Sequence, residues 1–312
     1  MRALVTGATG FVGERLAARL AAGGARVRCL VRDRGRAADL DRAGYELHEG
    51  DALDAASLRG VGRGVDVAYY LIHSMGRGAP SEGEFHRRDR EAARNFARTA
   101  LAEGVERVVY LGGLGEGKGS RHLESRHETA LVLGEEGPPL TYFRAAMVVG
   151  AGSESFRALR HLVARLPVMV APAWLRTPTQ PIGIDDVLEY LAAAPGVVAS
   201  AGRTVEIGGP DVLTYGDMVG EMAAALGKRR PPMIPVPLLT PWLSSLWVGL
   251  VTPVDAGVAR PLIEGLSTPT VVRDPAGARL FDVEPEGFAD VLRQAVAEER
   301  GSGGNRSGRP RA

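Results

Sequence analysis

Cysteine is almost missing from this sequence of 312 residues, in which Cys29 is the single example. An internal disulfide and a cysteine-based metal cluster are therefore excluded. The six histidines lack the spacing of a zinc-binding helix, so no metal site is expected. The Gly-x-Ser-x-Gly pattern is also missing, which removes the usual signal for a serine hydrolase of the nucleophile-elbow type.

An excess of charge is missing as well. The chain holds 38 basic and 37 acidic residues, which gives a formal net charge of +1. This balance gives no reason to expect nucleic acid as a partner. The first residues lack the apolar core of a signal peptide, so a cytoplasmic protein is expected.

The sequence does contain a repeating alternation of short apolar runs and helical patterns. The runs expected to form buried strands are residues 2–6, 27–31, 45–48, 65–72, 107–111 and 140–143. The helical patterns between them include 14–22, 84–103 and 120–133. Strands that alternate with helices predict an α/β doubly wound fold, a parallel sheet with helices on both faces. Such a fold binds its ligand beyond the carboxyl ends of the strands.

Three glycines at Gly-x-x-Gly-x-x-Gly spacing follow the first strand directly: Gly7, Gly10 and Gly13. The first allows a tight turn, the second lets backbone approach a pyrophosphate, and the third lets the helix pack on the strand. The helix N-terminus then directs N–H groups at the phosphates, so the pattern predicts a dinucleotide site. The other cofactor contacts are expected from Thr9, Phe11 and Val12 in the turn, and from Leu71 and Gly112 at strand ends.

The residues after the second strand indicate which dinucleotide is bound. An arginine there pairs with the 2′-phosphate of NADP, whereas an acidic residue binds the free ribose hydroxyl of NAD. Arg32 favours NADP, and the adjacent Asp33 is the alternative if the strand ends one residue later. Asp51, after the third strand, is placed either to meet the adenine end or to cap a helix near Asp54 and Ser57.

These residues resemble the short-chain dehydrogenase/reductase superfamily in its extended and atypical branches, and most closely its NmrA-like NAD(P)H-binding members. Further similar segments are residues 89–96, 104–111, 143–150 and 180–187, the third with Ala145 where the family has proline. The resemblance implies a Rossmann fold, an NAD(P) cofactor and an oxidoreductase activity.

The sequence departs from this family at the catalytic positions. Active members place a tyrosine, and a lysine four residues later, toward the nicotinamide. The matching positions here are Leu123 and His127, and the usual serine falls near Gly112 and Gly113. The resemblance therefore implies cofactor binding more strongly than it implies hydride transfer.

Two histidines are the candidates for catalysis. His127 is on the helical face expected to look toward the cofactor, where it serves as a general acid or a ribose ligand, or else is held within the helix packing. His73, with Ser74, follows the fourth strand at the carboxyl edge of the sheet, where the alternative is an ordinary pocket-forming loop. Arg144, which ends the sixth expected strand, is placed to meet the substrate or the cofactor.

The second half of the chain contains an uncharged stretch from Leu238 to Val254, which prolines interrupt at both ends. An apolar lid or pocket wall is expected there, and the alternative is peripheral contact with a membrane or a partner. Thr214 and Asp185 are expected to cap helices. The expected division is an NAD(P)-binding domain (1–150), a substrate-binding region (151–299) and a disordered tail (300–312).

Together these patterns predict an NAD(P)H-dependent oxidoreductase that acts on a small apolar carbonyl or enone without the Tyr-x-x-x-Lys pair. The alternative is a catalytically silent NAD(P)H-binding sensor, or a regulatory or assembly protein. The sequence leaves open whether the chain is a monomer or a homodimer.

Overall fold

The computed structural model describes residues 1–72, 82–115, 121–165, 168–235 and 266–306 of the chain. Two features of interest from the sequence fall outside these ranges. They are the His73–Ser74 pair and the uncharged stretch from Leu238 to Val254.

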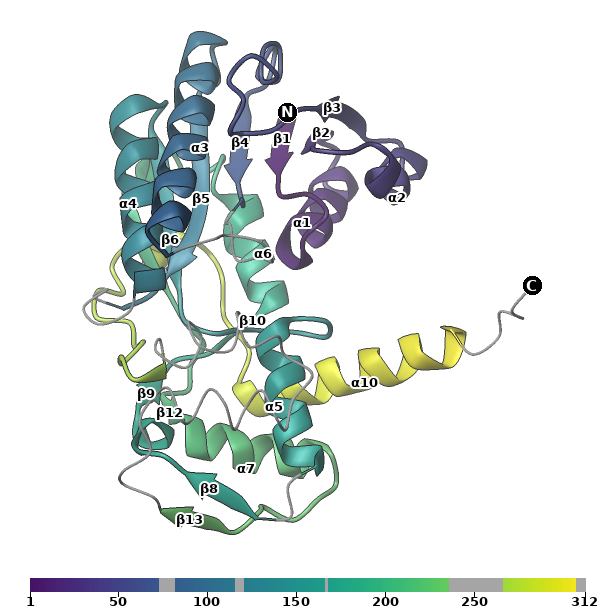
Figure 1. Ribbon diagram of the computed structural model, residues 1–312, viewed down its shortest axis with the longest axis vertical. Coiled ribbons are helices and arrows are strands. Elements are labelled where there is room, and N and C mark those ends of the chain that lie inside the picture. The colour runs from purple at the N-terminus through teal and green to yellow at the C-terminus, as the bar shows by residue number, and fades with distance from the viewer. Residues whose placement is uncertain (73–81, 116–120, 166–167, 236–265, 307–312) are drawn as a thin grey trace.

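The centre of the molecule is a seven-stranded sheet in the order β11-β6-β5-β4-β1-β2-β3 (Figure 1). All neighbouring strands in it are parallel. The strands are β1 (Arg2–Thr6), β2 (Arg26–Val31), β3 (Glu46–Glu49), β4 (Val67–Tyr70), β5 (Arg107–Gly113), β6 (Leu140–Ala145) and β11 (Thr204–Ile207). The predicted doubly wound fold is confirmed. The first six strands lie on the six apolar runs because a strand covered on both faces needs a nearly continuous apolar sequence.

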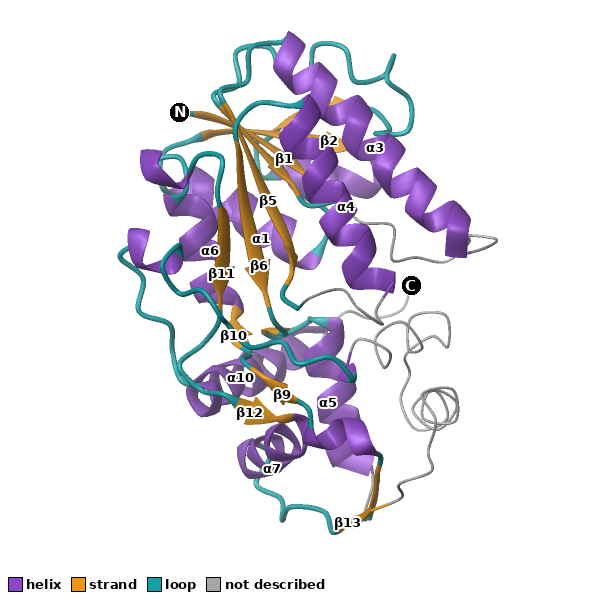
Figure 2. Cartoon of the chain, turned by 90° about the vertical axis from the view of Figure 1, so that its left-hand side faces the viewer, coloured by secondary structure: helices purple, strands orange, loops and turns teal. Residues whose placement is uncertain are grey.

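Helices cover both faces of this sheet, and Figure 2 shows the two layers on either side. One face packs against α1 (Phe11–Ala22), α2 (Ala38–Arg42) and α6 (Ile184–Ala193), whose buried residues share one core with the strands. The other face packs against α3 (Glu82–Ala102) and α4 (Arg121–Glu136), which form a second core. The reversal of strand order between β1 and β4 lies in the middle of the sheet, where a doubly wound fold opens its ligand crevice.

A smaller lobe with its own apolar core follows β6. Its helices are α5 (Glu154–Arg165), α7 (Tyr215–Ala225) and α10 (Phe288–Arg306). Its strands form three short pairs, β7 (Val148–Val149) with β10 (Ile182–Gly183), β9 (Pro178–Thr179) with β12 (Leu213–Thr214), and β8 (Met169–Ala171) with β13 (Met233–Pro235). Single 3₁₀ turns lie at η1 (Gly35–Ala37), η2 (Ala173–Arg176), η3 (Val198–Ser200) and η4 (Ala278–Leu280).

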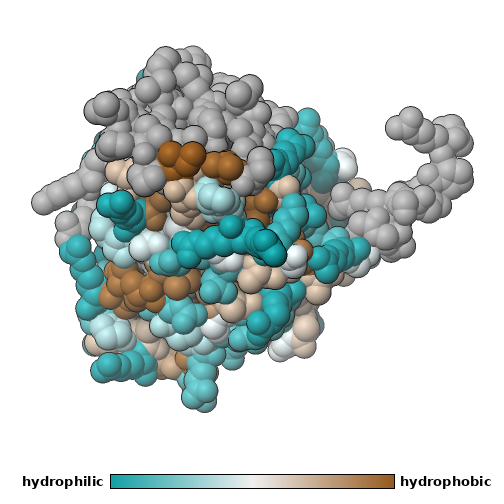
Figure 3. Space-filling model, turned by 90° about the horizontal axis from the view of Figure 1, so that it is seen from below, coloured by the Kyte–Doolittle hydropathy of each residue, from teal (hydrophilic) through white to brown (hydrophobic). Residues whose placement is uncertain are grey.

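Seen from below, the described part of the surface is a mixture of hydrophilic and hydrophobic side chains (Figure 3). Hydrophobic side chains gather there in separate groups rather than in one continuous face. Within the described ranges, no helix combines the length and the apolar character needed to pass through a lipid bilayer.

Two expectations about helix ends are wrong and one is confirmed. Asp185 does not cap α6, because the helix begins early enough for Gly183 to be its N-cap. Asp186, two residues into the helix, instead accepts hydrogen bonds from the N–H groups of Gly183 and Glu286. The tail expected from residue 300 is helical up to Arg306, since α10 continues past Glu299. Thr214 caps α7 as expected, in a reciprocal capping box with Asp217.

Candidate cofactor and catalytic site

The glycine turn, residues 7–13, has the geometry that its spacing predicts. Gly7 has φ of 64°, and a Cβ atom there would lie 2.7 Å from the carbonyl oxygen of Leu71 at the end of β4. A Cβ atom at Gly13 would overlap with the Gly7 carbonyl and lie 2.9 Å from the Cα atom of Ala8. Only glycine therefore allows the turn to pack against β4 and the helix to pack against the turn.

The first turn of α1 is available to an anion. Its N-cap, Gly10, supplies no side chain, and the first hydrogen bond of the helix runs from the Glu14 N–H to Gly10 O (3.0 Å). The N–H groups before Glu14 are therefore not used within the helix. Thr9 and Gly10 are exposed, and Phe11 and Val12 are half-buried. A helix N-terminus of this kind favours phosphate.

Sequence reasoning missed one residue that supports this turn. The hydroxyl group of Thr6, at the end of β1, donates to Tyr69 O (3.1 Å) and accepts from the Leu71 N–H (3.0 Å). Thr6 is fully buried, and its two bonds fix the carboxyl end of β4 beside the glycine turn. A hydroxyl residue that ends an apolar strand was the available signal, because a buried hydroxyl needs partners.

The residues after β2 decide between Arg32 and Asp33 as the side chain that contacts the ribose of the cofactor. The strand ends at Val31, so Arg32 comes first, and it is exposed without a bond to any described residue. Asp33 is used locally, because its Oδ1 atom accepts from the N–H groups of Gly35 (2.8 Å) and Arg36 (3.3 Å). The arginine is therefore the side chain available to a ligand.

Asp51 takes a local role in the loop after β3. Its Oδ1 atom accepts from the Leu53 N–H (3.0 Å), and its backbone N–H donates to the Ser57 hydroxyl (2.9 Å). The segment that follows is a series of turns rather than the expected helix. The alternative that Asp51 caps a helix is therefore wrong, and contact with adenine stays a prediction.

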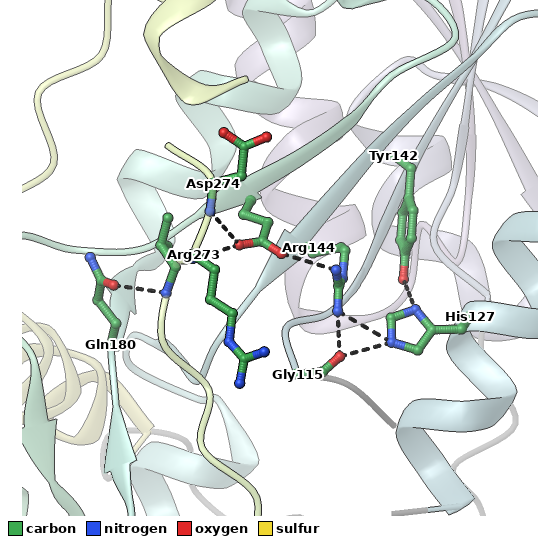
Figure 4. Close-up of polar contacts among 9 residues, drawn as sticks. Gly115, His127, Tyr142, Arg144, Gln180, Arg273 and Asp274 are labelled. Carbon is green, nitrogen blue, oxygen red and sulfur yellow. Dashed lines mark hydrogen bonds and ion pairs between the residues drawn. The ribbon is translucent and has the colours of Figure 1, made fainter. Parts of the chain in front are cut away.

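A second group of polar residues lies where β5 and β6 end (Figure 4). We call it the Gly115 cluster, and it consists of Gly115, His127, Tyr142, Arg144 and Glu206. The Gly115 carbonyl accepts from His127 Nε2 (3.0 Å) and from the Arg144 guanidinium. His127 Nδ1 lies 3.0 Å from the Tyr142 hydroxyl, which makes the imidazole a donor at Nε2 and an acceptor at Nδ1.

The same cluster extends through Glu206 to the segment that precedes η4. Arg144 donates to Glu206 Oε1 (3.0 Å), and the other carboxylate oxygen accepts from the N–H groups of Arg273 (2.7 Å) and Asp274 (3.1 Å). Neither side chain of this ion pair is more than a fifth exposed. Of these residues the sequence suggested only His127 and Arg144, since nothing local marks Glu206 as their partner.

The protonation state of His127 follows from this environment. Burial lowers the pKa of the imidazole below its ordinary value of 6.5; the bond to Gly115 opposes the shift, and the Arg144 charge adds to it. The ring is therefore neutral at neutral pH. Burial also raises the pKa of Tyr142, so its phenol stays protonated. Both nitrogens of His127 are engaged, and a proton leaves Nε2 only when its bond to Gly115 is broken.

Leu123, at the position where the family has tyrosine, is packed rather than free. Its side chain fills the space beside Gly113, where an added Cβ atom would overlap with it, and lies 3.1 Å from a Cβ position at Gly115. The leucine is buried. The position matched to the family's tyrosine is therefore apolar and closely packed.

Gly112 is the second-last residue of β5, where it pairs with Arg144 of β6. A Cβ atom there would be 2.8 Å from the Tyr142 hydroxyl and 3.2 Å from the ring of Tyr110. The two tyrosine rings stack with centroids 5.2 Å apart. The close approach of these rings gives this glycine a packing role, and its contact with a cofactor stays a prediction.

The structure thus brings the glycine turn and Leu71 together, and it gathers His127 and Arg144 in the separate Gly115 cluster. Comparison with known proteins adds a family to this geometry: residues 7–134 match the NAD(P)H-binding family. This match covers the glycine turn, Arg32 and His127.

Two curated relatives are similar to the chain. Sterol demethylase protein B of Methylococcus capsulatus is 32% identical over a match that covers 37% of this chain and only 35% of that relative's length. The (4-alkanoyl-5-oxo-2,5-dihydrofuran-3-yl)methyl phosphate reductase of Streptomyces griseus is 27% identical, over 72% of this chain and 74% of the relative.

The solved structures share the fold along almost the whole chain. The NADPH-dependent quinone oxidoreductase of Escherichia coli, solved with NADPH, superposes with a TM-score of 0.72. The superposition covers 94% of this chain and 98% of the other at 18% identity. The likeness extends through the small lobe, so both parts of the molecule have counterparts in a known architecture.

Proposed function

We propose that the chain is an NADPH-dependent oxidoreductase that reduces a small apolar carbonyl or enone. The proposal starts from the match of residues 7–134 to the NAD(P)H-binding family. The observation that carries the proposal is the glycine turn. It presents unused N–H groups of α1 at the middle of the sheet, where a doubly wound fold binds its ligand. Thr9, Gly10, Phe11 and Val12 would hold the pyrophosphate there.

The preference for NADP over NAD rests on Arg32. This exposed guanidinium directly follows β2, and Asp33 is occupied by the backbone of the next turn. A guanidinium pairs with a phosphate through charge-assisted hydrogen bonds, which a free ribose hydroxyl does not offer. Arg32 would therefore bind the 2′-phosphate and distinguish the two cofactors.

The substrate class is supported by the relatives and by the departure from the family's catalytic pattern. The Streptomyces relative is a reductase of a (4-alkanoyl-5-oxo-2,5-dihydrofuran-3-yl)methyl phosphate, and the similar Escherichia coli structure is a quinone oxidoreductase. A reduced nicotinamide supplies the hydride when bound. The chain's own contribution would be a proton from His127 or His73 and an apolar pocket from residues 151–299.

A second candidate function is an NAD(P)H-binding sensor or regulatory protein without catalysis. Two observations favour it. Leu123 fills the position of the family's tyrosine, and both nitrogens of His127 already have partners. A chain that kept the glycine turn and closed its catalytic region would bind the cofactor without turnover.

The test combines a cofactor titration with a screen for activity. Calorimetry with NADPH, NADP, NADH and NAD measures binding, and NADPH consumption is followed with enones and quinones. Turnover that collapses in His127→Ala and His73→Ala supports the reductase. Tight NADPH binding without turnover on any substrate supports the sensor, and a folded protein that binds no dinucleotide overturns both.

A further inference from the structure

A set of contacts outside the glycine turn holds the first turn of α1. Arg15 lies one helical turn after Phe11, and its Nη2 atom donates to Ala151 O (2.9 Å) and to Glu298 Oε1 (3.0 Å). Its Nη1 atom lies 3.4 Å from Phe11 O. Ala151 lies between β7 and α5, and Glu298 lies on α10, which crosses the small lobe beside α5 (Figure 1). One side chain therefore joins three segments that are distant in sequence.

The same guanidinium also holds the ring of Phe11. Its central carbon lies 4.5 Å from the ring centroid, which is the geometry of a cation–π contact. The ring also lies against the turn after β7, because a Cβ atom at Gly150 would be 3.0 Å from Phe11 Cζ. Phe11 is the first residue of α1, so these contacts fix the residue whose N–H opens the helix.

The position of α10 is tied to this arrangement. Glu298 and the next residue, Glu299, form ion pairs with Arg15 of α1 (3.0 Å) and with Arg160 of α5 (2.9 Å). The earlier part of α10 is buried in the core of the small lobe through residues such as Phe288 and Leu292. A helix of the small lobe is thus connected, through one arginine, to the start of the helix that faces the proposed phosphate site.

We infer that Arg15 is a positioning residue for the dinucleotide, and that through Glu298 it couples the docking of α10 to the orientation of the first turn of α1. The inference rests on the proposed binding of a dinucleotide at the glycine turn. An exposed ion pair contributes little by itself, and Glu298 is 53% exposed. The carbonyl oxygens of Ala151 and Phe11, together with the Phe11 ring, hold the Arg15 guanidinium in this position. Because coupling is reciprocal, a bound cofactor in turn stabilises the docked position of α10.

A direct electrostatic effect of Arg15 on the phosphates predicts a different result. Under that explanation, removal of Glu298 uncovers the positive charge of Arg15 and tightens the binding of an anionic cofactor. Under the positioning explanation, removal of Glu298 releases Arg15 and weakens binding. The variant Glu298→Ala therefore separates the two, and its site near the surface of α10 leaves the core unchanged.

The experiment measures the dissociation constant of NADPH by calorimetry in the full chain and its variants. We expect Arg15→Met to weaken binding about three- to tenfold, the size that residues along a coupling route produce. Glu298→Ala should weaken it by a smaller factor, because the other contacts of Arg15 remain. The double variant should bind no more weakly than Arg15→Met alone, because both changes break one connection. Arg15→Lys, which keeps the charge over the Phe11 ring, should restore part of the affinity.

Arg19→Met is the matched control. Arg19 lies on the same helix and forms an exposed ion pair with Glu189 of α6 at 3.6 Å, away from Phe11. This variant should bind NADPH as the wild type does. Hydrogen exchange supplies a second readout: NADPH should slow exchange in residues 288–298 of the wild type and of Arg19→Met, but not of Arg15→Met.

The inference is overturned if Arg15→Met binds NADPH like Arg19→Met, or if Glu298→Ala binds it more tightly. Either outcome leaves the proposed function intact, because the wild type still binds NADPH. If the folded wild type binds no dinucleotide, the proposed function fails, and this inference fails with it.

Discussion

The glycine turn and the Gly115 cluster lie at the same carboxyl edge of one sheet, yet their polar groups are in opposite states. The first turn of α1 has N–H groups that the helix does not use, and Arg32 nearby has no bond to a described residue. In the Gly115 cluster, His127 has a partner for each nitrogen, and Glu206 has a partner for each oxygen.

This difference distinguishes polar groups that are available to a ligand from polar groups that stabilise the fold. Unused donors at a helix N-terminus are satisfied by water or by an anionic ligand, and their geometry is already suited to phosphate. Polar groups that satisfy one another stabilise the fold, and removing one leaves its partner unpaired. Changes in the glycine turn should therefore alter cofactor affinity, whereas changes in the Gly115 cluster should alter stability first.

The largest effect is expected from Gly10→Val. The backbone of Gly10 is extended (φ −90°, ψ 168°), so valine fits it. Among the described residues, the contact of an added Cβ is with Gly7 O at 3.2 Å. The valine side chain would project into the approach to the helix N-terminus. We expect NADPH binding to weaken by at least roughly 2 kcal/mol, or about 30-fold. Calorimetry measures the affinity, and thermal unfolding should show a fold close to the wild type.

Gly13→Ala is the contrasting variant in the same turn. Its Cβ atom would overlap with the Gly7 carbonyl, so the helix cannot keep its distance from the strand. We expect this variant to lose stability, in contrast to Gly10→Val. Equal thermal stability of the two variants would contradict the packing role of Gly13. Normal NADPH affinity in Gly10→Val would show that the glycine turn does not bind the pyrophosphate.

A smaller effect is expected from Arg32→Met. The substitution removes the guanidinium proposed to bind the 2′-phosphate, so NADPH affinity should fall about tenfold, or about 1.4 kcal/mol, while NADH affinity stays unchanged. Arg36→Met is the control, since Arg36 is exposed and pairs with Asp33. The ratio of the two dissociation constants, measured by calorimetry, is the readout. An equal loss for both cofactors would contradict the assignment of Arg32.

The two regions also differ in how far the sequence predicts them. The glycine turn is local, so its spacing predicts both the tight turn at Gly7 and the close packing of the helix at Gly13. The contacts of these glycines are with the strand and the helix on either side of the turn, and every doubly wound α/β fold brings such a strand and helix together. Within this region the sequence analysis missed Thr6, whose two bonds become visible only when β1 and β4 lie side by side.

The Gly115 cluster is made by long-range contacts, and sequence patterns do not show such contacts. Arg144 and Glu206 are 62 residues apart and meet because β6 and β11 are neighbours in the sheet. The expectation that Asp185 caps α6 is wrong for a related reason. The start of that helix is set by pairing between β7 and β10, which fixes Gly183 in a strand.

A change confined to the Gly115 cluster tests whether this region is separate from the glycine turn. Tyr142→Phe removes the hydroxyl that donates to His127 Nδ1 (3.0 Å) and changes nothing else in the buried ring. The loss of one buried hydrogen bond should lower the free energy of unfolding by about 1 kcal/mol. NADPH affinity should stay within about twofold, as expected for a separate site. Urea unfolding and calorimetry measure the two quantities, and weaker NADPH binding without lost stability would show that the cluster belongs to the cofactor site.

The smallest effect concerns the dependence of stability on pH. The folded state lowers the pKa of His127 below 6.5, mainly by burial, so the unfolded chain binds a proton at this residue more readily. The contribution of the neutral ring to stability is therefore complete above pH 6.5 and is lost as the pH falls through the folded pKa. His127→Gln has no such proton to bind. The stability difference between wild type and His127→Gln, measured by urea unfolding, should shrink between pH 8 and pH 5. A difference that is constant or grows toward acid pH would mean that folded His127 accepts a proton as readily as the unfolded chain does. The Gly115 cluster would then not be the closed region, with a partner for each His127 nitrogen, that the comparison describes.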